Sequence, residues 1–364
     1  MAHDVVVLGA TVAGLTASRR LAAEGYDVVV LDPNLELRSA AIGHGVAAIG
    51  HASTVANMAH AYGLEAAREH VRRNIAALKE IRATLPDHDT RTLRDQSLPG
   101  GDERETQEIA ALYRSQGTQA TVAGGPRDAT LITEATCVDP AEYASALRTA
   151  AVGEGVQVVH GVTVTHLKRK EGVTRVGFRN NLAWARELGS ITGAAVIDTL
   201  GVSPWGRVAR VGPAQWVPVV RCVPGVPVTD VRLHATGPAW MVRPTTEGAL
   251  VLGQKTSLSS IDEATIELEQ WAAESLGAEW METGRLAIDP SDHGRPVVGA
   301  SAIPGGFYAR GNGRGELMNG TASGYYLATL LLGDDAAPGN ALPPLSRMRA
   351  YGSRLRRASH RPAE

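Results

Sequence analysis

The stretch that most constrains the fold is residues 4–32, where two runs of β-branched residues flank a glycine-containing loop. The runs DVVVLG and YDVVVLD are short and continuously apolar, which is typical of strands that are buried on both faces. Between them, Leu15, Ser18 and Leu21 recur at helical spacing, and Gly25 marks the end of that helix. Strand, helix and strand in so short a span form one βαβ unit, so the sequence predicts a parallel sheet with a right-handed crossover.

The loop of this unit, GATVAG at residues 9–14, resembles the dinucleotide-binding pattern G-x-G-x-x-G but has Thr11 in place of the middle glycine. The helix that follows offers unpaired N–H groups and a positive dipole end, which suit a diphosphate. Asp32 ends the second strand, where a carboxylate can accept hydrogen bonds from a ribose. Binding survives the substitution if the diphosphate shifts slightly or if the Thr11 hydroxyl donates to it; loss of binding is the alternative. The whole unit favours a dinucleotide site.

A second glycine-rich loop, GNGRGELMNG at residues 311–320, precedes a helix near the C-terminus. Its N–H groups and helix dipole also face an electron-rich partner. A reduced flavin accumulates negative charge at its N1–C2=O edge, whereas a nicotinamide has no use for such a loop. The pair of loops therefore predicts that the dinucleotide is FAD.

The remaining chain predicts a second, antiparallel sheet. Between residues 204 and 282, short strands such as WVPVVRCV, AWMVRP and GALVLGQK alternate with turns, and a helix follows at 263–276. Periodic apolar residues predict one amphipathic helix over 54–85, and Asp139 with Pro140 opens another helix. The expected fold class is α/β: a Rossmann-like FAD-binding domain with a discontinuous α+β substrate domain built on an antiparallel sheet.

The domains should be discontinuous, because the C-terminal glycine loop must return to the FAD-binding fold. We expect the FAD-binding domain at residues 1–85, 130–204 and 283–345, the substrate domain at 86–129 and 205–282, and a basic tail at 346–364.

The composition of the chain limits the classes of partner that it is expected to bind. The formal net charge is −2 with acids and bases mixed along the chain, which argues against nucleic acid or a membrane surface as a partner. No basic segment precedes an N-terminal apolar run and no stretch is long and apolar enough to span a bilayer, so we expect a cytoplasmic protein. Cys137 and Cys222 are too few for a disulfide framework or a structural zinc site, so we expect buried thiols and no metal.

The order of these segments resembles the D-amino acid oxidase superfamily of flavoproteins, in particular its glycine oxidase and sarcosine oxidase branch. The similar stretches are VVVLGATVAGLTASRRLAAEGYDVVVLD, RSAAIGHGVAAIG, CVDPAEYASALRTAAVGEGVQVVHGVTV, AVIDTLGVSPW and GRPVVGASAIPGGFYARGNGRGELMNGTASGYYLATLL. Together they cover most of residues 4–333.

The resemblance implies oxidation of the C–N bond of a small amine or amino acid by hydride transfer to flavin N5, which gives an imine, with O2 as electron acceptor and H2O2 as product. A flavin-dependent dehydrogenase, a tailoring enzyme for an unusual amine and a cofactor-less relative remain as alternatives. The oligomeric state is left open. The residues implied to hold FAD are Gly9, Ala10, Thr11, Val12, Ala13, Gly14, Asp32, Pro33, Ser39, Ala40, His44, Gly45, Val164, Gly201, Gly311, Asn312, Gly313, Arg314, Gly315, Glu316 and Leu317.

One departure concerns the substrate. Relatives that oxidise amino acids place an arginine in an R-P pair to clamp the substrate carboxylate, but this chain has Asp289–Pro290 there, which would favour a cation. Arg314 is the first alternative clamp, and Arg285 is another; each could instead be an ordinary solvated arginine. Arg243, in MVRP, is a further candidate on a strand of the expected substrate sheet.

Histidine and tryptophan side chains complete the candidate site. His44 is expected beside the flavin as a polar contact, with covalent attachment or a half-buried structural role as alternatives. His51 lies in the same segment. Trp205, Trp216 and Trp240 either line the substrate cavity or pack as ordinary aromatic residues.

Overall fold

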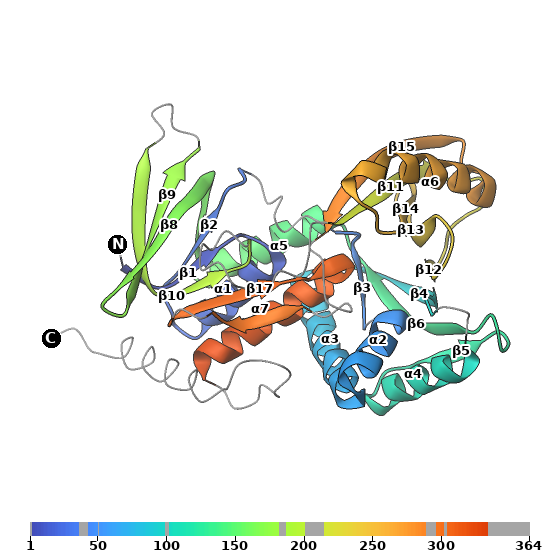
Figure 1. Cartoon of the computed structure of the whole chain (residues 1–364), viewed down its shortest axis with the longest axis horizontal. Coiled ribbons are helices and arrows are strands. Elements are labelled where there is room, and N and C mark those ends of the chain that lie inside the picture. The colour runs from blue at the N-terminus through green and yellow to red at the C-terminus, as the bar shows by residue number, and fades with distance from the viewer. Residues whose placement is uncertain are drawn as a thin grey trace.

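The computed structural model describes residues 2–35, 43–49, 51–98, 102–181, 187–200, 215–288, 296–301 and 304–333. Within these ranges the chain forms two sheets. In Figure 1 the first sheet, with the N-terminal strand, lies on the left and the second on the right, with α3 (Leu64–Thr84) between them. The fold class is the expected one: a parallel sheet with helices, joined to a mainly antiparallel sheet.

The first sheet is built on the predicted βαβ unit. Its central strands run parallel, whereas β16 is antiparallel to β17 and β9 is antiparallel to β10. In sheet order the strands are β16 (Val297–Ala300), β17 (Gly306–Arg310), β10 (Leu188–Asp198), β1 (Ala2–Leu8), β2 (Val28–Asp32) and β7 (Gln157–His160).

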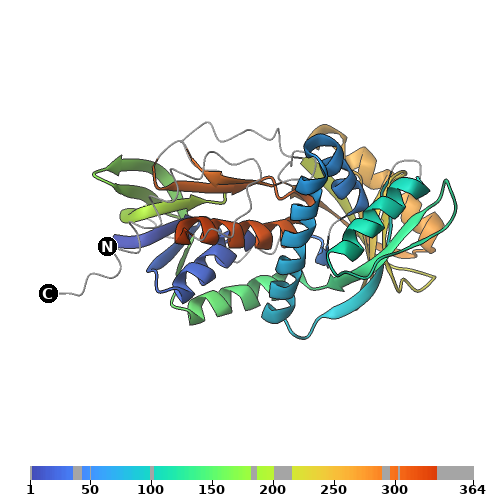
Figure 2. The same ribbon diagram turned by 90° about the horizontal axis from the view of Figure 1, so that it is seen from below.

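Alternate residues of these strands enter two separate cores, as the period of a strand requires. Val5, Val7 and Val30 pack against α1 (Val12–Ala23), α5 (Pro140–Gly153) and α7 (Glu316–Leu332). The intervening Val6 and Val29 pack against the hairpin of β8 (Val162–Lys170) and β9 (Val173–Asn180). Both faces are thus covered, which explains the continuous apolar runs in the sequence; the three helices lie side by side in Figure 2.

The second sheet is antiparallel except where β12 pairs parallel with β4. Helix α6 (Ile261–Leu276) covers one face, and the other face carries a separate apolar cluster that includes Trp240, Met241 and Leu250. In sheet order the strands are β15 (Trp280–Ile288), β11 (Gln215–Val223), β14 (Gly248–Gly253), β13 (Ala239–Thr245), β12 (Val231–His234), β4 (Asp89–Gln96), β6 (Thr130–Cys137) and β3 (Val46–Ala48), with β5 (Thr121–Ala123) beside β6.

This sheet gathers strands from stretches far apart in the chain. The expected domain boundaries assign residues 46–48, 130–137 and 283–288 to the FAD-binding domain, whereas these residues hydrogen-bond into the second sheet. The boundaries themselves stay a prediction.

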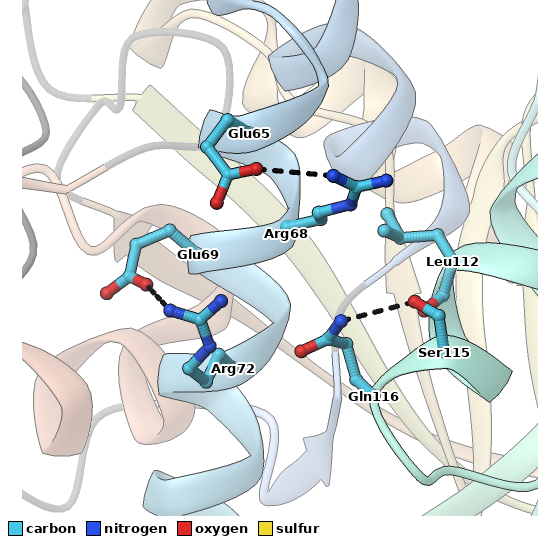
Figure 3. A network of polar contacts seen from close by, with 7 residues as sticks. All are labelled: Glu65, Arg68, Glu69, Arg72, Leu112, Ser115 and Gln116. Carbon is cyan, nitrogen blue, oxygen red and sulfur yellow. Dashed lines mark hydrogen bonds and ion pairs between the residues drawn. The ribbon is translucent and has the colours of Figure 1, made fainter.

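The single helix expected over 54–85 is wrong in one respect, because the segment forms two helices, α2 (Ala52–Tyr62) and α3, that meet at Gly63. Gly63 has φ +86°, a conformation that favours glycine and redirects the chain. Figure 3 shows the outer surface of α3, where Arg68 pairs with Glu65 and Arg72 with Glu69, close to the end of α4 (Glu103–Ser115). The Glu65–Arg68 pair is exposed and adds little stability, whereas Glu69 is buried and pairs with both Arg72 and Arg73.

Both cysteines are buried free thiols, as expected, and burial raises the pKa of each. Among the described helices, none combines the length and apolar character that a bilayer crossing needs.

Candidate functional site

The predicted cofactor loops meet at one edge of the first sheet. Because β1, β2, β10 and β17 run parallel, their carboxyl ends lie together. The segments that leave this edge begin at Gly9, Pro33, Thr199 and Gly311. In open parallel sheets, ligands bind in the crevice outside these strand ends, so this edge is the candidate cofactor site.

The first loop depends on glycine at two positions. Gly9 has φ +110°, and a Cβ added to Gly14 would lie 2.1 Å from the carbonyl oxygen of Gly9. A contact that short with backbone cannot be relieved by a side-chain rotation. Gly14 therefore lets the first turn of α1 approach the end of β1, which leaves the helix N-terminus facing the crevice.

Thr11, which replaces the middle glycine, is the N-cap of α1. Its Oγ1 accepts a hydrogen bond from the Gly14 amide at 3.0 Å and donates to Thr199 Oγ1 at 2.8 Å. Thr199 Oγ1 in turn donates to the carbonyl oxygen of Leu8 at 3.0 Å. The Thr11 hydroxyl proton is thus engaged within the protein, so a slightly shifted diphosphate fits this loop better than one bonded to that hydroxyl.

Two helix donors remain for a ligand. Leu15 donates its amide to the carbonyl oxygen of Thr11, and Gly14 donates to the Thr11 side chain. The amides of Val12 and Ala13 donate to no other residue in the part of the chain that the structure describes. Two amides at a positive helix end form a cradle that suits phosphate oxygens.

Asp32 lies at the end of β2 and is fully buried. Its Oδ2 accepts from the Ala10 amide at 2.6 Å and its Oδ1 accepts from the Asn34 amide at 2.8 Å. Each carboxylate oxygen can accept a further hydrogen bond, so Asp32 both fixes the loop and can hold ribose hydroxyls. These residues fit FAD.

Two residues at the same edge were missed by the sequence reasoning. Asp198, at the end of β10, is buried and accepts the Leu200 amide at 3.0 Å, as Asp32 accepts Asn34. Thr199 relays the Thr11 bond to Leu8. The signal was available, since AAVIDTLG is a buried strand that ends in Asp and Thr at the carboxyl edge.

The second loop is organised by Asn312. Gly311 and Gly313 have φ values of +68° and +61°, and a 3₁₀ turn over Gly313–Gly315 leads into α7. Asn312 Oδ1 accepts from the Ser323 hydroxyl at 3.3 Å, and its carbonyl oxygen accepts from Asn319 Nδ2 at 2.8 Å. The loop is thereby tied to its own helix.

The first turn of α1 lies against the second and third turns of α7. A Cβ added to Gly320 would lie 3.0 Å from the Cβ of Val12, and one added to Gly324 would lie 2.5 Å from the carbonyl oxygen of Ala13. These two α7 glycines let the helices pack closely near their N-termini. Both helices also begin at the carboxyl edge of the parallel strands, so two positive helix ends lie at this edge, which favours a polyanionic or electron-rich ligand.

A second group of predicted residues surrounds β3. His44 is 3% exposed, more deeply buried than the half-buried alternative supposed, and its Nδ1 accepts the Val46 amide at 3.1 Å. The rings of His44 and His51 lie 5.6 and 5.4 Å from the ring of Trp240 on β13. Since β3 also contacts α7, this aromatic group adjoins the cofactor edge.

Arg243 belongs to the same group. It lies on β13, is 9% exposed, and a Cβ added to Gly45 would lie 3.1 Å from its Nη2. Burial lowers its pKa, and Arg221 lowers it further, whereas Cys137 and Asp139 raise it. Nearby, a cavity of about 300 Å³ lies between Gly43 and the second sheet, where Arg221, Leu250, Leu252, Glu282 and Arg285 line it.

Other candidates are not brought into these groups. Val164 lies on β8, on the face of the first sheet away from the helices, and Trp216 packs under the Arg285 guanidinium at 5.6 Å. The side chain of Arg314 is outside what the structure describes. The candidates that lie outside the described residues are Ser39, Ala40, Gly201, Trp205, Asp289 and Pro290.

Comparison with protein families gives a match over residues 4–330 to the family described as FAD dependent oxidoreductase. Comparison with curated proteins found no match. Solved structures share the fold at low sequence identity.

Glycine oxidase from Geobacillus kaustophilus is 18% identical with a TM-score of 0.68, over 93% of this chain and 97% of that one. Iminodiacetate oxidase from Chelativorans sp. BNC1 is 20% identical with a TM-score of 0.66, over 95% and 98%. L-proline dehydrogenase from P. horikoshii is 15% identical with a TM-score of 0.65, over 98% of each chain. At these identities the likeness is one of fold.

Proposed function

Because the chain belongs to the family of FAD dependent oxidoreductases, we propose that it binds FAD and oxidises the C–N bond of a small amine or amino acid. The observation that carries the proposal is that α1 and α7 both begin at the carboxyl edge of the parallel sheet and pack against each other. One helix end suits the diphosphate of FAD, and the other suits the flavin edge where negative charge accumulates on reduction.

The roles of the chain's own groups follow from this arrangement. The Val12 and Ala13 amides bind diphosphate oxygens, and Asp32 accepts hydrogen bonds from the ribose. Because His44 Nδ1 accepts the Val46 amide, its neutral ring carries the proton on Nε2, where it can donate. Bound FAD supplies a hydride acceptor, N5. The protein aligns the C–H beside the amine nitrogen with that atom and excludes water around it.

An imine would be the immediate product, which water hydrolyses. We further propose O2 as the electron acceptor, with release of H2O2. Solved neighbours include enzymes titled oxidase as well as one titled dehydrogenase, so transfer of electrons to another acceptor is the second candidate.

Cofactor binding and the acceptor are tested together. Protein freed of small molecules and incubated with FAD should retain yellow absorbance through gel filtration. Turnover of an amine in air should then yield one H2O2 per amine oxidised. Retained FAD without peroxide, but with reduction of an artificial acceptor, would favour the dehydrogenase. No retained FAD would contradict the proposal and favour a cofactor-less relative.

A further inference from the structure

The carbonyl oxygen of Asn312, in the second glycine loop, is held by a buried side chain of α7. Asn319 Nδ2 donates a hydrogen bond to it at 2.8 Å, and both residues are 7% exposed. Because a carbonyl oxygen can only accept, this contact also fixes which end of the Asn319 amide faces the loop. The same side chain lies against the loop at Gly315, where an added Cβ would be 2.9 Å from Asn319 Nδ2.

The direction of this carbonyl determines where the next amide points. A trans peptide unit is planar, and its C=O and N–H point in opposite directions. Since the Asn312 carbonyl points toward Asn319, the N–H of Gly313 points away from that side chain. Gly313 is buried, and within the part of the chain that the structure describes its amide donates to no residue. A buried N–H without an acceptor is rare and costly, so we expect a ligand to supply the acceptor.

The backbone of the loop does not by itself fix this peptide. Gly313 has φ +61°, and glycine adopts positive and negative φ with similar ease, so the Asn312–Gly313 peptide is free to rotate unless it is held. The Asn312 side chain is bound separately, because its Oδ1 accepts from the Ser323 hydroxyl and its Nδ2 donates to Glu316, each at 3.3 Å. Those two bonds hold the side chain, whereas the bond from Asn319 holds the carbonyl and thereby the direction of the Gly313 amide.

We propose that Asn319 is a positioning residue for the flavin, which keeps the Gly313 N–H directed at the N1–C2=O edge where negative charge accumulates on reduction. The inference rests on the proposed function, in which the start of α7 faces that edge. A hydrogen bond to a charged acceptor is stronger than one to a neutral acceptor, so a fixed N–H at this edge favours reduced over oxidised flavin. Asn319 thereby raises the reduction potential of bound FAD through the loop.

The test measures stabilisation of charge at this edge without turnover, and sulfite is the probe. The sulfur lone pair of sulfite forms a bond to flavin N5, and an electron pair of the flavin moves to the N1–C2=O edge, which becomes negatively charged. Titration of the FAD-loaded protein with sulfite, followed as loss of the yellow absorbance, gives the dissociation constant. Equilibration with a reference dye gives the two-electron reduction potential.

Two variants of α7 are compared. Asn319→Leu removes the donor and keeps the branched shape of the side chain. Thr321→Val is the matched control, because Thr321 is also buried on α7 but its hydroxyl donates to the carbonyl oxygen of Leu317 in the same helix. Asn319→Ala removes the donor without adding apolar volume, so it keeps the test decisive if Asn319→Leu does not fold.

Asn319→Leu and Asn319→Ala should bind sulfite about 10-fold more weakly than the wild type, which corresponds to a fall of about 30 mV in the two-electron potential. Thr321→Val should match the wild type in both measurements. Unchanged sulfite affinity and potential in the Asn319 variants would overturn the proposal, as would a wild type that binds no sulfite. An equal loss in Thr321→Val would overturn it as well, since any buried polar group of α7 would then have the same effect.

Failure of the proposed function is a separate result. In that case the FAD-loaded protein binds sulfite and responds to the Asn319 variants as expected, but no amine reduces the flavin. A protein that retains no FAD would overturn both the proposed function and the role of Asn319.

Discussion

The two sheets contribute to the candidate site in different ways. At the edge of the parallel sheet, the ligand-facing groups are mainly backbone amides at helix ends, with glycines at the close approaches. On the antiparallel sheet, the candidate groups are side chains: Arg221 and Glu282 line the cavity, and Trp240 and Arg243 are buried in the same sheet. A backbone site tolerates few changes of shape, whereas a side-chain site can change specificity by single substitutions. We therefore expect variants of the first region to affect cofactor binding and those of the second to affect substrate choice.

The largest effect is expected at Gly14. In Gly14→Ala the new Cβ meets the carbonyl oxygen of Gly9 at 2.1 Å, so the first turn of α1 must move away from β1. We expect FAD affinity to fall by at least about 100-fold, because the diphosphate cradle is displaced. Titration of the apoprotein with FAD, followed by flavin fluorescence, measures this.

Gly153→Ala is its control. Gly153 ends α5, and an added Cβ there has no atom within 4 Å. That variant should bind FAD like the wild type. Equal FAD affinity in Gly14→Ala would mean that the α1 end is not the diphosphate site.

The side-chain region should also bring a pH dependence of stability. His70 lies on α3, close enough to His51 for the two charges to interact. Burial of His70, together with the nearby Arg73 and His51, lowers its pKa from 6.5 to about 4. Between about pH 6.5 and 4 the unfolded chain therefore binds a proton that the folded chain does not. The free energy of unfolding should fall on acidification through this window, by at most about 3 kcal/mol.

Denaturant unfolding of wild type and His70→Gln across this pH range is the measurement. The variant should lose that part of the slope. The matched variant His60→Gln, at an exposed position, should keep the wild-type profile. An identical pH profile in wild type and His70→Gln would contradict the account.

The features of the parallel sheet and its helices were easier to predict from the sequence than those of the antiparallel sheet. The βαβ unit, the helix opened by Asp139 and Pro140, and the strand at residues 188–198 are recognisable because local periodicity and caps determine them. The break at Gly63 was missed, because apolar periodicity continues across it.

The side-chain region was harder to predict for a physical reason. Whether Arg243 lies on the α6 face of the sheet or on the opposite face depends on strand register, and the sequence does not specify that register. Likewise, the relay from Thr11 through Thr199 to Leu8 joins residues 188 positions apart in its first step. Only the assembled sheet brings such groups together.

The smallest effect on stability is expected at Thr11, which stands where the dinucleotide-binding pattern has its middle glycine. Its hydroxyl makes hydrogen bonds within the protein. Thr11→Ala removes the cap of α1 and the bond to Thr199, so the free energy of unfolding should drop by about 1 kcal/mol. Thr11→Ser should keep both bonds and most of the stability. Denaturant titration distinguishes them; a stability of Thr11→Ala equal to that of wild type would show that the relay contributes nothing.

The most direct test of the central claim is anaerobic reduction of the FAD-loaded protein by a panel of amines and amino acids, followed as loss of the yellow flavin absorbance. The account predicts that at least one amine or amino acid of the panel bleaches the flavin rapidly. A protein that binds FAD but is reduced by none of the panel, while a chemical reductant bleaches it fully, would contradict the claim that this site oxidises a C–N bond.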